Sequence, residues 1–275
     1  MSFELEDKKT PTPNPLLAKL KLPGRMFPLP SRALCYTDEV SESCKATGEV
    51  QVMTMSALAE IKMKSADLLY SGKAIEEVFL ECIPDIKKPM ALAQQDIDAL
   101  LMYLRIVTYG EQLEIETEHT CDDAKLHKYP FNLDALVGKT DGVMLTKEQW
   151  EMAYQVTLSN GQRVRLRPRP FSTMIHLIQE TQLAVKGGTL SAEDAQKLFI
   201  LQMVASIQSV DDVNDPEMIN QWVRQIKPKM RTAIMNQLEE ANKWGFNLKP
   251  SIACKDCGVN FDYELPLNPV NFFSE

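Results

Sequence analysis

The chain has 275 residues, of which 44% are hydrophobic and 25% are charged, and it carries a net charge of −8. This acidic balance argues against a dedicated nucleic-acid-binding protein, because such proteins usually have a basic domain. No run approaches the roughly 18 apolar residues of a membrane span, so we expect no contact with a membrane. A chain of this length can bury a core without disulfides or metals, so any bound metal would reinforce the fold locally.

The N-terminal region lacks the apolar core of a signal peptide, which predicts that the protein stays in the compartment where it is made. We expect that compartment to be reducing. The six cysteines are therefore predicted to be free thiols or metal ligands rather than disulfides.

Residues 1–47 are predicted to form an extended N-terminal arm. Six prolines between Pro11 and Pro30 oppose helix formation. The same stretch carries more large apolar residues than a solvated tail would: Leu16, Leu17, Leu20, Leu22, Met26, Phe27 and Leu29. Two interpretations are open, namely a segment that lies on its own domain and an arm that docks on a neighbouring subunit.

Residues 48–136 are predicted to be a helix-and-strand part. Residues 48–55 alternate in polarity as a short strand does. Apolar residues then recur at helical spacing in three stretches, about residues 56–70, 73–83 and 95–108. Beyond Gly110, apolar residues alternate with glutamates, which predicts a second strand that ends near Cys121.

Residues 137–247 are predicted to be a hairpin followed by a helical insertion. The sequence alternates on both sides of Asn160-Gly161, and Asn-Gly favours the two positive φ angles of a type I′ turn. From there to about residue 244 the pattern is almost wholly helical. Ser191 and Asp215-Pro216 are typical of helix starts.

An arginine stripe follows the hairpin turn and consists of Arg163, Arg165, Arg167 and Arg169. A period of two places alternate residues on one face of a strand. The stripe is either a solvated face or a contact with an acidic neighbour or with phosphates.

Residues 248–275 return to strands and contain the sharpest chemical feature, Cys254-Lys-Asp-Cys257-Gly258. Two thiolates at this spacing bind one tetrahedral zinc from a tight turn, or knuckle, and the glycine after them eases that turn. A redox pair of the same spacing would open a helix after a strand. Here a strand-like stretch follows, so a metal site is the favoured interpretation.

The knuckle supplies two of four ligands. The residues best placed to supply the other two also end a strand and precede a strand-like stretch, and His127 is the substitute for the histidine among them. The predicted ligands of one structural Zn²⁺ are His119, Cys121, Cys254 and Cys257. The alternative is that all four are ordinary residues at a strand edge.

Together these predictions give an α+β fold. It is a split zinc-ribbon-like strand module with a large, mainly helical insertion and an extended N-terminal arm. The first half of the module ends the part of residues 48–136, and the second half, with a C-terminal tail, lies in residues 248–275.

Catalytic motifs are missing from the sequence. The chain has three histidines, and it shows no nucleophile elbow, phosphate-binding loop, dinucleotide fingerprint or H-E-x-x-H motif. We therefore predict no enzymatic activity and no small-molecule substrate.

Four segments carry a resemblance to a known family: GEVQVMTMSA at 48–57, QQDIDALLMYLRIVTYG at 94–110, the cysteine-bearing strand after it, and CKDCGVNFDYELPLNPVNFF at 254–273. Through them the chain resembles baseplate hub and hub-assembly proteins of contractile-tailed, T4-like bacteriophages. Such proteins look as though they carry a cysteine pair in both halves, whereas this chain has His119-Thr-Cys121 in the first half.

The resemblance implies a structural or assembly protein of the tail baseplate. It implies a late protein, made in the host cytoplasm and located in the virion, whose partners are other baseplate or hub proteins.

Two other functions are alternatives. A nucleic-acid-binding zinc-ribbon module would use the Arg163–Arg169 stripe, and its binding would depend steeply on salt. A hydrolase would need an open zinc with three protein ligands plus water, and a general base that the sequence does not identify.

Overall fold

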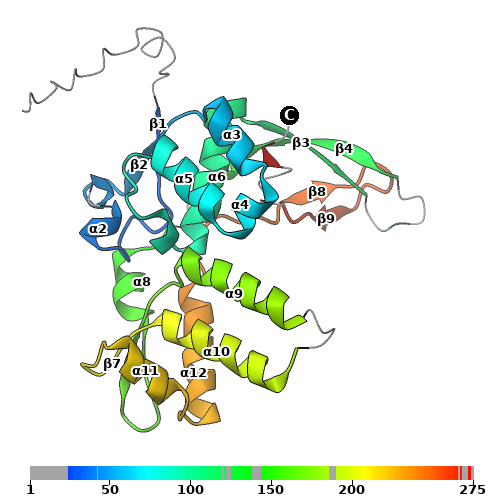
Figure 1. Cartoon of the computed structure of the whole chain (residues 1–275). Coiled ribbons are helices and arrows are strands. Elements are labelled where there is room, and N and C mark those ends of the chain that lie inside the picture. The colour runs from blue at the N-terminus through cyan, green and yellow to red at the C-terminus, as the bar shows by residue number, and fades with distance from the viewer. Residues whose placement is uncertain are drawn as a thin grey trace, which may run out of the picture.

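The structure, a computed structural model, describes residues 24–41, 43–118, 121, 125–137, 144–185, 190–265, 267 and 272–273. The protein is α+β and combines helices with small antiparallel sheets (Figure 1). None of the described helices has the length and apolar character needed to span a lipid bilayer.

The elements of the first part are β1 (Arg25–Pro28), α2 (Asp38–Ser41), η1 (Ser43–Lys45), β2 (Glu49–Val52), α3 (Ala57–Met63), α4 (Ala66–Tyr70), α5 (Lys73–Cys82), η2 (Pro89–Ala91), α6 (Gln94–Tyr109), β3 (Gln112–Thr117), β4 (His127–Asn132) and α7 (Leu133–Val137). Those of the second part are α8 (Lys147–Met152), β5 (Gln155–Thr157), β6 (Arg163–Leu166), α9 (Phe171–Val185), α10 (Ala192–Ser206), β7 (Ile207–Val210), α11 (Pro216–Val223), α12 (Pro228–Ala241), β8 (Ser251–Ala253) and β9 (Asn260–Asp262). The strands pair as β1 with β2, β3 with β4, β5–β6–β7, and β8 with β9.

The first hydrophobic core forms around helix α6. Tyr103 in the middle of α6 is fully buried and stacks on Phe27 of β1, with 4.2 Å between the ring centroids. The Tyr103 hydroxyl also donates a 2.7 Å hydrogen bond to the carbonyl of Pro28. Helix α6 therefore holds strand β1 by an aromatic stack and by a polar contact.

The described part of the N-terminal arm, residues 24–41 and 43–47, folds onto its own chain. Strand β1 pairs with β2, and Phe27 and Leu29 are at most 2% exposed. Short helical turns, α2 and η1, follow the strand. Of the two interpretations of the arm, these residues follow the first, and residues 1–23 lie outside the described residues.

A buried carboxylate fastens the segment after β1 to the start of α6. Asp96 accepts hydrogen bonds from the Ser31 amide at 2.9 Å and from the Tyr36 hydroxyl at 2.5 Å, and it is fully buried. The Tyr36 oxygen in turn accepts from the Ala93 amide at 2.8 Å. Burial raises the pKa of Asp96 to about 6, although these hydrogen bonds favour the charged form.

The second core joins the β5–β6–β7 sheet to helices α10, α11 and α12. Its polar centre is the buried Tyr154, whose hydroxyl donates to Asn242 Oδ1 and accepts from Trp244 Nε1, both at 2.7 Å. Buried polar groups cost free energy unless they are hydrogen-bonded. This network therefore lets the residues after α12 pack against the hairpin.

Strand β7 differs from the helix that the sequence predicts for this region. Residues Ile207–Val210 pair with β6 and form the third strand of the sheet. Only Ile207 and Val210 are buried in this strand. An apolar pair three residues apart fits a helix as well as a strand, so the sequence has no distinct signature for β7.

The predicted hairpin between β5 and β6 is present, but the prediction of a type I′ turn is wrong. The Leu158 amide donates to the Gln162 carbonyl at 2.8 Å, which leaves a three-residue loop. Of the loop residues only Gly161 has a positive φ, of 87°, as in a type I turn closed by a glycine bulge. This longer loop brings Val156 opposite Val164, an apolar cross-strand pair.

Replacing Phe27 with alanine should lower the free energy of unfolding by roughly 3–5 kcal/mol, because it removes a buried ring from the α6 core. Met26 is the matched control, since it is 50% exposed on the same strand. We expect Met26→Ala to change stability by less than about 0.5 kcal/mol. Urea unfolding measures both, and equally small effects would contradict the placement of β1 in the core.

Asp96→Asn should change how stability depends on pH. The folded-state pKa of about 6 lies above the unfolded value of about 3.9, so the folded protein holds this proton more tightly. The stability that the proton contributes is complete below about pH 4 and is lost as the pH rises through about 6, for a total of about 3 kcal/mol. Urea unfolding across this window should show the wild type losing stability relative to the variant, and a constant difference would contradict the raised pKa.

Candidate metal centre

Two β-hairpins that are far apart in the sequence lie side by side (Figure 1). Strands β3 and β4 are connected by residues 118–126, which contain Cys121. Strands β8 and β9 are connected by residues 254–259, which contain Cys254 and Cys257. The first connection therefore carries one cysteine and the second carries two.

Backbone hydrogen bonds shape the turn between β8 and β9. The Cys254 amide donates to the Val259 carbonyl and the Gly258 amide donates to the Cys254 carbonyl, both at 2.9 Å. Gly258 has a φ of 73°, a conformation that residues with a Cβ adopt only at a cost. The glycine after the second cysteine therefore eases the turn, as the sequence predicts.

The turn brings three sulfur atoms together. The Sγ atoms of Cys121, Cys254 and Cys257 all lie within 4.8 Å of one another. Cys254 is only 4% exposed, whereas Cys121 is half-buried and Cys257 is exposed. These three residues, called the cysteine cluster below, could hold a metal ion.

Backbone amides favour ionisation of the central thiol of the cluster. The amides of Cys257 and Asp256 donate to the Cys254 sulfur and lower the pKa of that thiol to about 7. Partial burial and the two neighbouring thiols raise the pKa of Cys121 to about 11. Ionisation of one thiol therefore opposes ionisation of the next, and a bound cation would allow all three to be thiolates.

The donor set fits a metal that prefers sulfur. Calcium and magnesium take oxygen ligands, whereas thiolates select zinc among common divalent ions. Three protein sulfurs occupy three positions of a tetrahedron and leave one for a further ligand.

The structure brings together three of the four predicted ligands, Cys121, Cys254 and Cys257. His119 lies outside the described residues. His127, the substitute for it, is not part of the cysteine cluster.

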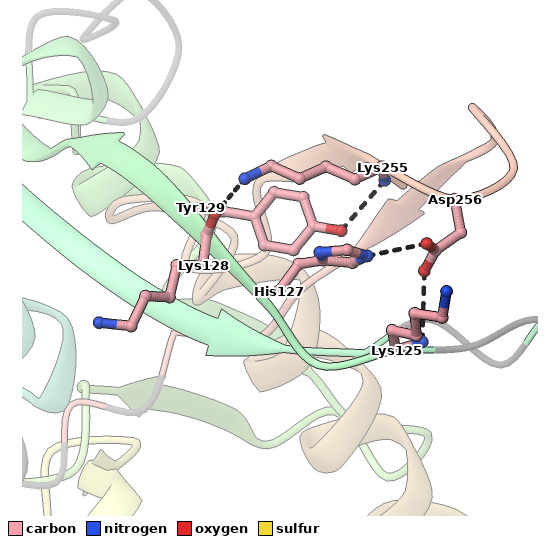
Figure 2. Close-up of polar contacts among 6 residues, drawn as sticks. All are labelled: Lys125, His127, Lys128, Tyr129, Lys255 and Asp256. Atoms are coloured by element: carbon pink, nitrogen blue, oxygen red, sulfur yellow. Dashed lines mark hydrogen bonds and ion pairs between the residues drawn. The ribbon is translucent and has the colours of Figure 1, made fainter.

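Polar contacts beside the cluster have no counterpart in any pattern of the sequence. His127 Nε2 lies 2.8 Å from Asp256 Oδ1, and the Lys255 amide donates to the Tyr129 hydroxyl at 3.2 Å (Figure 2). The sequence identifies Lys255 and Asp256 only as the spacer between two cysteines. Their charges are the one feature of the sequence that could indicate these contacts. Charge alone does not identify which residue, more than a hundred positions away, each side chain contacts.

The arginine stripe does not form a single free face. Arg165 donates to the carbonyls of Glu151 at 2.9 Å and Trp150 at 2.8 Å, and its guanidinium lies 4.6 Å from the centre of the Trp150 ring. Arg167 Nε donates to the Ala205 carbonyl at 3.0 Å. Burial lowers the pKa of both guanidinium groups. These two side chains hold α8 and α10 to the sheet, which weighs against the nucleic-acid-binding alternative.

The chain belongs to the family described as T4 bacteriophage base plate protein, whose model matches residues 42–274. The match spans both hairpins and all of the helical region between them. Comparison with curated proteins gave no match, and neither did comparison with solved structures. Family membership confirms the resemblance to T4-like baseplate proteins, whereas a place in the hub stays a prediction.

Replacing Arg165 with alanine should lower the free energy of unfolding by roughly 1–3 kcal/mol, because two carbonyls lose a charged donor and Trp150 loses its cation. Arg163 is the control, since it belongs to the same stripe and is exposed. Arg163→Ala should change stability by less than about 0.5 kcal/mol. Chemical denaturation distinguishes the two, and a negligible effect of Arg165→Ala would show that its side chain is not needed by the fold.

Proposed function

We propose that this chain is a non-catalytic structural or assembly protein of a phage tail baseplate. The observation that carries the proposal is the family match over residues 42–274. Its partners in this proposal are other baseplate or hub proteins. Its place is the tail of the virion, after synthesis in the host cytoplasm.

We further propose one structural Zn²⁺ per chain, bound by Cys121, Cys254, Cys257 and His119. The approach of three sulfurs to within 4.8 Å supports the three cysteines. His127 is engaged with Asp256, so His119 is the better candidate for the fourth ligand. Four protein ligands would leave no position for water, which is typical of a structural rather than a catalytic zinc.

The two hairpins would then form a split zinc-ribbon-like module, with residues 137–247 inserted between its halves. An isolated two-stranded hairpin is marginally stable in water. Joining two of them at their tips would restrict the unfolded chain and stabilise both.

Mass spectrometry of purified phage particles tests the baseplate role. A permanent subunit should be found in the tail fraction, and an assembly factor should be required for baseplates to form. Normal baseplates from a phage that lacks the chain, with no copy of it in wild-type particles, would overturn the proposal.

Protein purified without chelator should contain about one zinc per chain by elemental analysis. Cys257→Ser should lose the metal, whereas Cys35→Ala, a cysteine outside the cluster, should keep it. Chelation should lower the free energy of unfolding by about 4 kcal/mol relative to protein in free zinc at about 1,000 times the Kd. Most helix should survive, because the helices pack in two separate cores.

His119→Ala should weaken zinc binding without abolishing it, because three sulfur ligands would stay in place. A metal-free protein of full stability, with all three clustered thiols reacting freely, would contradict the zinc site.

A further inference from the structure

The two residues between the knuckle cysteines are attached to the neighbouring hairpin (Figure 2). Asp256 uses both of its carboxylate oxygens. Oδ1 lies 2.8 Å from His127 Nε2, and Oδ2 accepts a hydrogen bond from the Lys125 amide at 3.2 Å. This one carboxylate therefore joins the turn of the β8–β9 hairpin to the start of β4.

Lys255 adds a second attachment to the same strand. Its amide donates to the Tyr129 hydroxyl at 3.2 Å, and its ammonium donates to the Lys128 carbonyl and lies 5.0 Å from the centre of the Tyr129 ring. The Tyr129 side chain is itself buried and meets Phe261 of β9 edge-on, at 6.3 Å between centroids. Main-chain and side-chain contacts together fix the turn against β4.

The pair of Asp256 and His127 is better shielded from water than the surface ion pairs. Its side chains are 15% and 27% exposed. The pair of Lys128 and Glu114, on the same hairpin, has exposures of 62% and 59%. Solvent and salt weaken exposed pairs much more than shielded ones. The shielded pair is therefore the local side-chain contact best able to hold a fixed geometry.

We propose that Lys255 and Asp256 form a clasp that holds the two knuckle cysteines against Cys121 before any metal binds, with Asp256 as the main positioning residue. Lys125, whose amide binds Asp256, lies four positions after Cys121. The same carboxylate therefore attaches the knuckle to the segment that follows Cys121 in the chain. Preorganisation raises affinity, because the chain does not have to be ordered at the moment of binding.

The first test uses metal-free, full-length protein and diamide, which oxidises two neighbouring thiols to a disulfide. The wild type should form disulfides from Cys121 to a knuckle cysteine, together with the local Cys254–Cys257 disulfide. Asp256→Ala should lose most of the disulfides across the hairpins and keep the local one, because backbone hydrogen bonds still shape the turn. Peptide mass spectrometry gives the ratio of the two products, so the local disulfide is an internal control.

Three further variants sharpen this test. Asp262→Ala is the matched control, since Asp262 is exposed on β9 and its side chain makes no ion pair with any residue that the structure describes. Asp256→Asn should restore trapping in part, because it keeps an oxygen for the Lys125 amide. Tyr129→Phe keeps the ring and removes only the acceptor of the Lys255 amide, so it weakens the clasp with little risk to the fold.

The second test rests on the proposed zinc site. Zn²⁺ affinity, measured by competition with a chromogenic chelator, should fall roughly 10–100-fold in Asp256→Ala and stay unchanged in Asp262→Ala. With Co²⁺ as the probe, the visible absorption bands of the bound form should keep their positions in Asp256→Ala, because the same sulfurs bind. That spectrum separates a positioning residue from a lost ligand.

Trapping across the hairpins at the wild-type level in both Asp256→Ala and Tyr129→Phe would overturn the clasp. If the wild type bound no zinc while Asp256→Ala still lost the trapping, the zinc site would be refuted and the clasp would stand. Unchanged zinc affinity in Asp256→Ala would refute its positioning role.

Discussion

Helix α6 is the constraint on which the rest of the structure depends. Ten of its 16 residues are buried, so neighbours cover it around most of its circumference. Its first turn holds the segment after β1 through Asp96, and its middle holds β1 itself through Tyr103. It ends at Gly110, whose φ of 91° lets the chain turn directly into β3.

The end of α6 also receives the C-terminal tail. Near the other end of the described chain, the ring of Phe273 lies 6.5 Å from that of Tyr109. Because β3 leaves from α6 and the tail after β9 returns to it, the two hairpins are brought alongside each other by the core.

The helical region between the hairpins is tied to the other end of the same helix. The Phe171 amide donates to the Leu92 carbonyl at 2.7 Å as the chain enters α9. As it leaves α12, the Asn242 carbonyl accepts from Gln95 Nε2 at 3.3 Å. The stretch from α9 to α12 is therefore fixed beside the start of α6 at both of its ends, and its helices do not stand between the two halves of the cysteine cluster.

Local patterns in the sequence predicted most elements, whereas contacts between distant residues were not predictable. The apolar stripe before Gly110 predicted α6 to within a residue at each end. The single helix predicted over about residues 56–70 is instead two helices, α3 and α4. They are separated at Ser65, which has an extended backbone and is the N-cap of α4.

The candidate site was predictable only in part. The spacing of Cys254 and Cys257 predicted the knuckle. The similar position of Cys121, at the end of a strand, predicted its approach to them. The clasp had no such signal, because hydrogen bonds to an amide and a tyrosine hydroxyl depend on tertiary structure alone.

The hairpin pair has little hydrophobic core of its own. Its apolar cluster contains three buried residues, Ile115, Tyr129 and Leu265, and two-stranded hairpins need more support than that. Contacts at the tips must therefore supply what the core does not. Hydrogen bonds of the clasp can form without a cofactor, but they assemble three thiols of which one ionises readily and then opposes ionisation of the next. Partial burial and the neighbouring thiols raise the pKa of Cys121, whereas backbone amides lower that of Cys254. A bound cation would remove that penalty. In the proposed site the clasp thus lowers the entropic cost of assembling the ligands, and the metal lowers the electrostatic cost of ionising them. This division would account for a metal-type knuckle in a chain that already has two large cores, because the stability that a metal would supply is needed at the hairpin tips and not in the body.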